Sequence, residues 1–283
     1  MNNRRAIARQ AMAAALRTRL SAGYRLDRPV CVYDLAERLG VEVRFLDLPS
    51  MEGMYSSASG PTIIVSSLRP RGRRAFTCAH ELGHHNRKDG VEIDELVEQW
   101  ENPSFDPKEF MADCFAGALL MPKMAVSRAF AVRGWNMEQC TPEQALMVSG
   151  YFGVGYTTLV HHMRSALQVL PYSQASELLR VSPRKAQSLL LGWHTPQSVL
   201  VVDTHWCGRA IDVEVGDFIF FQGRAQTEGL CLEPSSGLHC GRLFQAVRPG
   251  IGRLEADIGW SAFVRVSRRD YVGRALYRHW EEA

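Results

Sequence analysis

The chain has 283 residues, of which 22% are charged and 46% hydrophobic, and its formal net charge is +3. This length suits one large domain or two smaller ones, and the composition is that of an ordinary globular protein. The small charge does not by itself indicate nucleic-acid binding, and the absence of a run of about eighteen apolar residues predicts no transmembrane helix.

Helices and short strands are predicted ahead of the first motif. Residues 1–20 form an alanine-rich helix with five arginines and no acidic residue, typical of an amphipathic surface helix or, as the alternative, of a transit peptide. Residues 27–39 form a second helix that ends at a glycine, and residues 41–45 alternate as a strand. Residues 61–66 form a strand just before the next helix. An exposed edge there would pair with an extended peptide, whereas an internal strand would offer no such edge.

The segment His80-Glu81-Leu82-Gly83-His84 carries the most chemistry. On a helix, residues four apart lie on the same face, so His80 and His84 can reach one metal ion. Glu81 then lies beside the metal, where a general base takes a proton from a water that the metal holds. A helix with two core histidines is the alternative.

A second helix, predicted from residue 108 to Pro122, supplies the third ligand. It is apolar on most of its surface, but Glu109 and Asp113 interrupt that surface at i and i+4. A buried carboxylate is costly unless it is paired or bound to a metal. We therefore expect Glu109 to bind the metal and Asp113 to accept the free ring N–H of a ligand histidine. A carboxylate stabilised by the helix dipole and a capping or paired aspartate form the alternative.

These residues resemble the ImmA/IrrE family of metallopeptidases. The similarity lies in residues 76–84, in the pattern Glu109-x-x-Ala112-Asp113, and in the run ending at Pro122, over roughly residues 5–170. The resemblance implies a zincin-like core in which His80, His84 and Glu109 bind one Zn²⁺ (or another divalent ion such as Mn²⁺) and Glu81 is the catalytic base. It also implies cleavage of a helix-turn-helix repressor of the XRE type. Many family members have Asn at the position of Asp113, and either side chain can accept from an imidazole.

Charge is segregated around the first motif. Arginines precede it and acidic residues follow it: Arg69, Arg71, Arg73 and Arg74, then Asp89, Glu92, Asp94, Glu95, Glu98 and Glu101. Such runs are typical of solvated faces. The alternatives are arginines that hold an acidic stretch of substrate and an acidic loop that acts as a lid.

Residues 141–164 predict two short helices broken by a glycine-containing turn, as in a helix-turn-helix. The second helix carries only Arg164 as a fixed positive charge, and phosphate contacts need several Lys or Arg side chains, so direct DNA binding is not expected. Tyr156, His161 and His162 are candidates for transition-state stabilisers near the metal, with core or surface positions as the alternative.

Strand patterns dominate beyond residue 195. Residues 199–203 and 213–221 predict strands, and residues 271–280 a short helix. The histidines and cysteines of this part match no close zinc spacing. Seven cysteines without a Cys-x-x-Cys pair fit a reducing cytoplasm.

The sequence therefore predicts an α+β protein of three parts. Residues 1–135 form a zincin-like, mostly helical metallopeptidase domain with a small sheet, residues 136–195 a helix-turn-helix-like segment, and residues 196–283 a β-rich sensor or partner-binding domain. The expected function is a cytoplasmic, zinc-dependent endopeptidase that cuts a repressor without a membrane partner. A catalytically silent sensor or binding module and a direct DNA-binding regulator are the alternatives.

Overall fold

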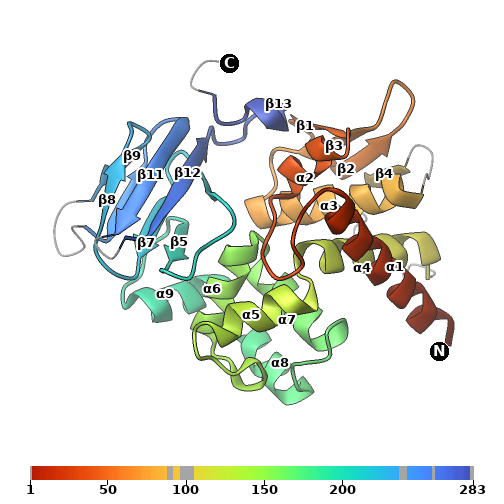
Figure 1. The fold of residues 1–283 in the computed structure, drawn as a ribbon, viewed down its shortest axis with the longest axis horizontal. Coiled ribbons are helices and arrows are strands. Elements are labelled where there is room, and N and C mark those ends of the chain that lie inside the picture. The colour runs from red at the N-terminus through yellow and green to blue at the C-terminus, as the bar shows by residue number, and fades with distance from the viewer. Residues whose placement is uncertain (1, 88–91, 96–104, 236–240, 257–258, 281–283) are drawn as a thin grey trace.

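A computed structural model describes residues 2–87, 92–95, 105–235, 241–256 and 259–280. The order of elements is helical with an inserted sheet, then helical, then almost entirely strands (Figure 1). This arrangement is the mixed α/β architecture that the sequence predicts.

The first part of the chain contains a small sheet and the helices that pack on it. Its elements are α1 (Asn2–Ser21), α2 (Val32–Arg38), β1 (Glu42–Leu46), β2 (Met51–Ser56), β3 (Thr62–Ser66), α3 (Arg71–Arg87), β4 (Glu92–Glu95), α4 (Pro107–Leu120) and α5 (Lys123–Ala131). Ala11, Ala14 and Ala15 of α1 are buried, and α1 packs on α4. Helix α3 lies between α4 and strands β2 and β3. The N-terminal helix is therefore part of the core packing.

The sheet has the strand order β13-β1-β3-β2-β4. Strand β3 is parallel to β1 on one side and antiparallel to β2 on the other. The prediction of an exposed strand edge at residues 61–66 is therefore wrong, because both edges of β3 are hydrogen-bonded to neighbouring strands.

A group of short helices follows, as predicted for the middle of the chain. It consists of η1 (Met137–Gln139), α6 (Pro142–Phe152), α7 (Tyr156–Ser165), α8 (Tyr172–Arg180) and α9 (Pro183–Leu191). Thr141 and Gln144 form a reciprocal capping box at the start of α6, and Gly153 ends it with a φ of 68°. Left-handed backbone of this kind favours glycine, and the turn directs the chain into α7.

The last part is built from strands, with a short helix only at its end. The elements are β5 (Val199–Val202), β6 (Ile211–Glu214), β7 (Phe218–Phe221), β8 (Ala225–Glu228), β9 (Leu232–Pro234), β10 (Leu243–Ala246), β11 (Gly250–Ala256), β12 (Ser261–Ser267), β13 (Gly273–Arg274) and η2 (Ala275–Tyr277). They form two four-stranded sheets, β5-β7-β10-β9 and β6-β12-β11-β8. The helix expected over residues 271–280 is only the 3₁₀ turn η2.

Strand β13 belongs to the first sheet and not to these two. Its residues Gly273 and Arg274 pair antiparallel with Phe45 and Arg44 of β1, and Figure 1 shows the last coloured segment beside the first strands. The end of the chain thus completes the sheet that lies behind α3.

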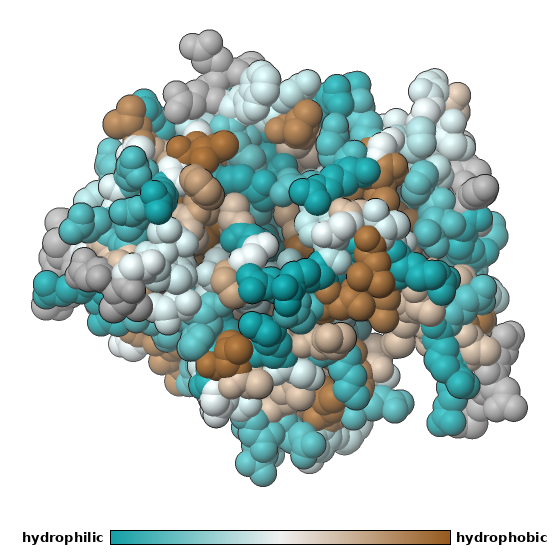
Figure 2. Space-filling view, in the orientation of Figure 1, coloured by the Kyte–Doolittle hydropathy of each residue, from teal (hydrophilic) through white to brown (hydrophobic). Residues whose placement is uncertain are grey.

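One stretch, Pro107–Ala131, has the length and hydropathy of a membrane span, but 61% of its most apolar window is buried within the protein. It comprises two helices, α4 and α5, with Pro122 between them. These are features of core helices. On the face drawn in Figure 2, hydrophobic side chains are scattered among hydrophilic ones.

Candidate metal centre

Helix α3 presents both histidines of the motif on its buried side. His80, Glu81 and His84 are 6%, 1% and 2% exposed. The His80 and His84 rings lie with their centroids 4.9 Å apart, as expected for residues one helical turn apart. These side chains are buried because α4 packs on this side of α3.

Helix α4 brings two carboxylates to the same place. Asp106 caps its start by accepting from the backbone N–H of Lys108, and Pro107 occupies the first turn, where no N–H is needed. Glu109 and Asp113 then project from successive turns toward His80. Asp113 Oδ1 lies 3.0 Å from His80 Nδ1, and Glu109 Oε2 lies 3.1 Å from His80 Nε2.

His80, His84 and Glu109 form a group of three potential ligands, with one ligand atom of each within 4.8 Å of the others. The two Nε2 atoms are 3.1 Å apart, and His84 Nε2 lies 3.5 Å from Glu109 Oε1. Ligand atoms about 2.0–2.1 Å from a tetrahedral zinc ion would be about 3.3 Å apart. Two imidazole nitrogens and the Glu109 carboxylate, which approaches His80 through Oε2 and His84 through Oε1, therefore fit a zinc-type site with an open fourth position.

The electrostatics of the ligand group also favour a cation. Burial alone lowers the pKa of His80, but hydrogen bonds from its ring to Asp113 and Glu109 raise it to about 10. The hydrogen bond to His80 likewise lowers the pKa of Glu109. Because Asp113 accepts a hydrogen bond from Nδ1 of His80, it fixes the ring tautomer in which Nε2 is directed at Glu109 and His84.

Glu81 faces strand β2. A Cβ atom added to Gly53 would lie 3.2 Å from Glu81 Oε1 and 2.4 Å from the methyl group of Thr77. Only glycine permits this close approach of strand and helix. The carboxylate of Glu81 is thus held beside the ligand group but outside it. No sequence motif marks Gly53, because its role depends on a packing contact between distant elements.

A cleft of about 560 Å³ opens beside His80 and Glu109, between α3, α4 and α7. His161 is exposed and lines this cleft. His162 borders it, but its Nε2 lies 2.9 Å from the Met121 carbonyl oxygen, and burial lowers its pKa to about 4. Tyr156 is buried and donates to the carbonyl of Leu178. Of the three candidate stabilisers, the structure therefore brings His161 to the cleft in an accessible position.

The arginines that precede the motif are engaged within the protein. Arg69 and Arg73 pair with Glu52 of β2, and the other two pair with acidic residues of the last part of the chain: Arg71 with Asp217 and Arg74 with Glu214. Of the acidic residues expected to form a loop, Asp89, Glu98 and Glu101 lie outside the described residues, and Glu92, Asp94 and Glu95 belong to β4.

Fold and site together define an α/β protein with a His-His-Glu group on two packed helices, in which both histidines are buried and the Glu109 side chain is 46% exposed rather than buried as expected. Residues 36–164 match the IrrE N-terminal-like domain, Peptidase M78. This match supports the resemblance to the ImmA/IrrE family that the sequence motifs predict.

No curated protein matches the chain. A solved structure described as a Mycobacterium tuberculosis transcriptional regulator is similar, with 22% identity over 59% of this chain and a TM-score of 0.39. The similarity covers 49% of that protein, so the chain spans about half of its length.

Proposed function

We propose that this protein is a zinc-dependent regulatory endopeptidase that hydrolyses a peptide bond in a helix-turn-helix repressor. The observation that carries the proposal is the separation of 3.1–3.5 Å among the ligand atoms of His80, His84 and Glu109. The family match of residues 36–164 supports peptidase chemistry. The repressor substrate rests on the resemblance of the motifs to ImmA/IrrE proteins.

Each residue has a distinct role in this proposal. His80, His84 and Glu109 would hold the Zn²⁺, which when bound polarises the scissile carbonyl and makes a nearby water more acidic. Glu81 accepts the proton of the attacking water and returns it to the leaving amine nitrogen. His161 lies on the wall of the cleft and would donate a hydrogen bond to the developing oxyanion.

The test combines metal analysis with proteolysis. The purified protein is assayed for bound zinc and manganese and incubated with a helix-turn-helix repressor of the XRE type, before and after chelation. We expect cleavage that is lost on chelation and restored by added metal, and we expect no bound metal in the His80→Ala/His84→Ala variant. Full metal occupancy in that variant would refute the ligand assignment. Binding of the repressor without cleavage would instead indicate a catalytically silent binding module.

A further inference from the structure

A second cavity lies away from the metal centre, where the three parts of the chain meet. Its volume is about 150 Å³, and its walls come from the segment before α2, the first turns of α3, the end of α6, strand β6 and the end of the chain. We call it the arginine cavity, because four arginines line it: Arg71, Arg74, Arg209 and Arg278. None of the residues proposed for catalysis borders it.

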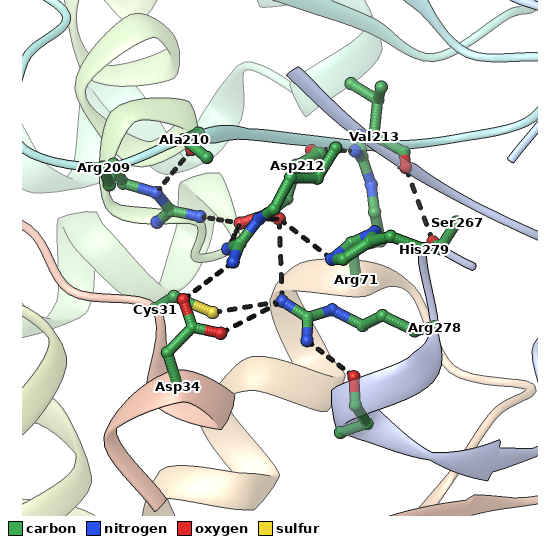
Figure 3. Close-up of polar contacts among 12 residues, drawn as sticks. Cys31, Asp34, Arg71, Arg209, Ala210, Asp212, Val213, Ser267, Arg278 and His279 are labelled. Carbon is green, nitrogen blue, oxygen red and sulfur yellow. Dashed lines mark hydrogen bonds and ion pairs between the residues drawn. The ribbon is translucent and has the colours of Figure 1, made fainter. Parts of the chain in front are cut away.

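The charges beside this cavity do not balance when Asp34 and Arg265 are counted, which pair with lining residues but do not line the cavity themselves. Figure 3 draws polar contacts of Asp34, Asp212, Arg209 and Arg278. Asp212 is within 2.7–2.9 Å of Arg265 and Arg209 and 3.7 Å from Arg278. Asp34 also pairs with Arg265 and Arg278, at 2.8 and 3.5 Å. Three guanidinium groups thus share two carboxylates, which leaves one positive charge. Arg71 pairs with Asp217, which it shares with Arg269, and Arg74 pairs with Glu214. A partly buried excess charge of this kind favours an anion.

Three residues of the wall, Arg74 among them, carry buried nitrogen atoms without a hydrogen-bond partner among the described residues. These atoms are Nε of Arg74, Nε1 of Trp206 and both ring nitrogens of His279. These side chains are 6%, 2% and 7% exposed. Burial, with Arg278 nearby, lowers the pKa of His279 to about 3, so the ring is neutral and its 3.7 Å contact with Asp212 is no ion pair. An indole and a guanidinium can only donate, so the missing partner must offer acceptors.

The cavity also has an apolar lining. This lining comes from Val30, Phe45, Leu120, Phe152 and Leu200. An apolar cavity of about 150 Å³ accommodates a molecule the size of benzene. The cavity therefore combines space for a small hydrocarbon body with donors and one excess positive charge at its edge.

We infer that the arginine cavity is a binding site for a small organic monocarboxylate with an apolar body of one ring or a short chain. The carboxylate would accept from the unpartnered donors and neutralise the excess charge, since guanidinium and carboxylate groups are geometrically complementary. Arg71 and Arg74 lie on α3, the helix that also carries His80 and Glu81. The ligand would therefore join the last part of the chain to the helix of the metal centre.

The experiment titrates the full-length protein with benzoate and with butyrate by calorimetry. Benzyl alcohol serves as the neutral analogue and inorganic phosphate as the anion without an apolar body. Two variants address the site: His279→Leu removes the ring nitrogens, and Ala75→Leu adds side-chain volume at the wall. His194→Leu is the matched control, because His194 is exposed and lies outside the cavity.

We expect one molecule of benzoate or butyrate to bind per chain, about tenfold or more weaker in both site variants and unchanged in the control. Neither benzyl alcohol nor phosphate should bind comparably. His279→Leu leaves no hydrogen bond of the ring unmade, so this variant should fold. The inference is overturned if neither acid binds, which would leave the cavity to water, or if both site variants bind as tightly as the parent. Equal binding of benzyl alcohol, or binding of phosphate alone, would also overturn it.

Discussion

Glu81 is the residue on which the proposed chemistry depends most directly. It is 1% exposed and lies on the same helix as the two histidines, one position beyond His80. We predict that Glu81→Gln keeps the fold and the bound metal but cleaves substrate roughly 10²–10⁴-fold more slowly, because the amide cannot accept the proton of water. Metal analysis and a single-turnover cleavage assay measure the two properties separately. Cleavage at the parent rate would show that another group is the base.

Asp113 would act on the proposed metal only through His80. Its Oδ1 lies 3.0 Å from His80 Nδ1 and holds the ring in one tautomer. We expect Asp113→Ala to weaken metal binding about 10–100-fold, measured by competition with a chromophoric chelator. Asp113→Asn is the control, because its amide oxygen can accept the same hydrogen bond. Equal affinities of the parent protein and both variants would remove Asp113 from the site.

His162 makes the stability of the protein depend on pH. Burial lowers its pKa to about 4, below the value of about 6.5 in an unfolded chain. The unfolded state therefore binds the proton first. The contribution of this group to the free energy of unfolding is fully present above about pH 6.5. It is lost as the pH falls toward 4, and the loss is on the order of 3 kcal/mol.

The replacement His162→Gln tests this dependence. Glutamine can still donate to the carbonyl of Met121 but does not titrate. Urea unfolding between pH 4 and 7 should show a smaller loss of unfolding free energy on acidification than in the parent protein. The neighbouring variant His161→Gln, at an exposed position, should retain the parent slope. Parallel slopes for all three proteins would exclude His162 as the source.

At the scale of elements, α3 is held at its start by a contact with the turn between α6 and α7. A Cβ on Gly72 would lie 2.7 Å from the backbone nitrogen of Gly155 and 2.8 Å from the carbonyl carbon of Val154. Farther along α3, a Cβ on Gly83 would be 3.1 Å from Ala112 Cα. Glycine thus permits the contacts of α3 with two other helical segments.

We predict that Gly72→Ala lowers the free energy of unfolding by about 1–3 kcal/mol, even though alanine is the better helix former. Backbone atoms at 2.7–2.8 Å must move to admit the methyl group. Gly83→Ala should cost less, because its nearest contact is longer. Urea unfolding of the two variants gives the order, and a Gly72→Ala protein as stable as the parent would contradict this packing argument.

At the scale of the whole molecule, the proposed metal ligands and Glu81 all precede residue 196. We propose that residues 196–283 are a regulatory or partner-binding domain. Strand β13 nevertheless pairs with β1, and Arg265 pairs with Asp34. These contacts connect the last part of the chain to the first sheet.

A truncation ending at Pro196 tests how separate the two parts are. It retains the whole ligand group but loses β13, so we expect bound metal together with a lower melting temperature and altered cleavage of the substrate. Atomic absorption and thermal unfolding provide the two measurements. An insoluble fragment without metal would show that the strands beyond residue 196 are required for the first part to fold.

The sequence by itself determined the features that depend on local periodicity. The four-residue spacing of His80 and His84 and the carboxylates on an apolar helix predicted the ligand group, because residues one turn apart meet on any regular helix. Helix ends marked by glycine and proline were also predicted, because proline cannot continue a helix and glycine readily adopts the left-handed backbone that ends one. The start of α2 was placed too early, at residue 27 instead of Val32.

The tertiary structure alone decided the features that depend on contacts between distant segments. They include the internal position of β3, the return of β13 to β1, and the approach of Gly53 to Glu81. The arginine cavity joins residues that are more than 200 positions apart, such as Cys31 and Arg278. Strand pairing and side-chain packing leave no periodic signal in one sequence, since each contact is set by the register and the volume of its partner.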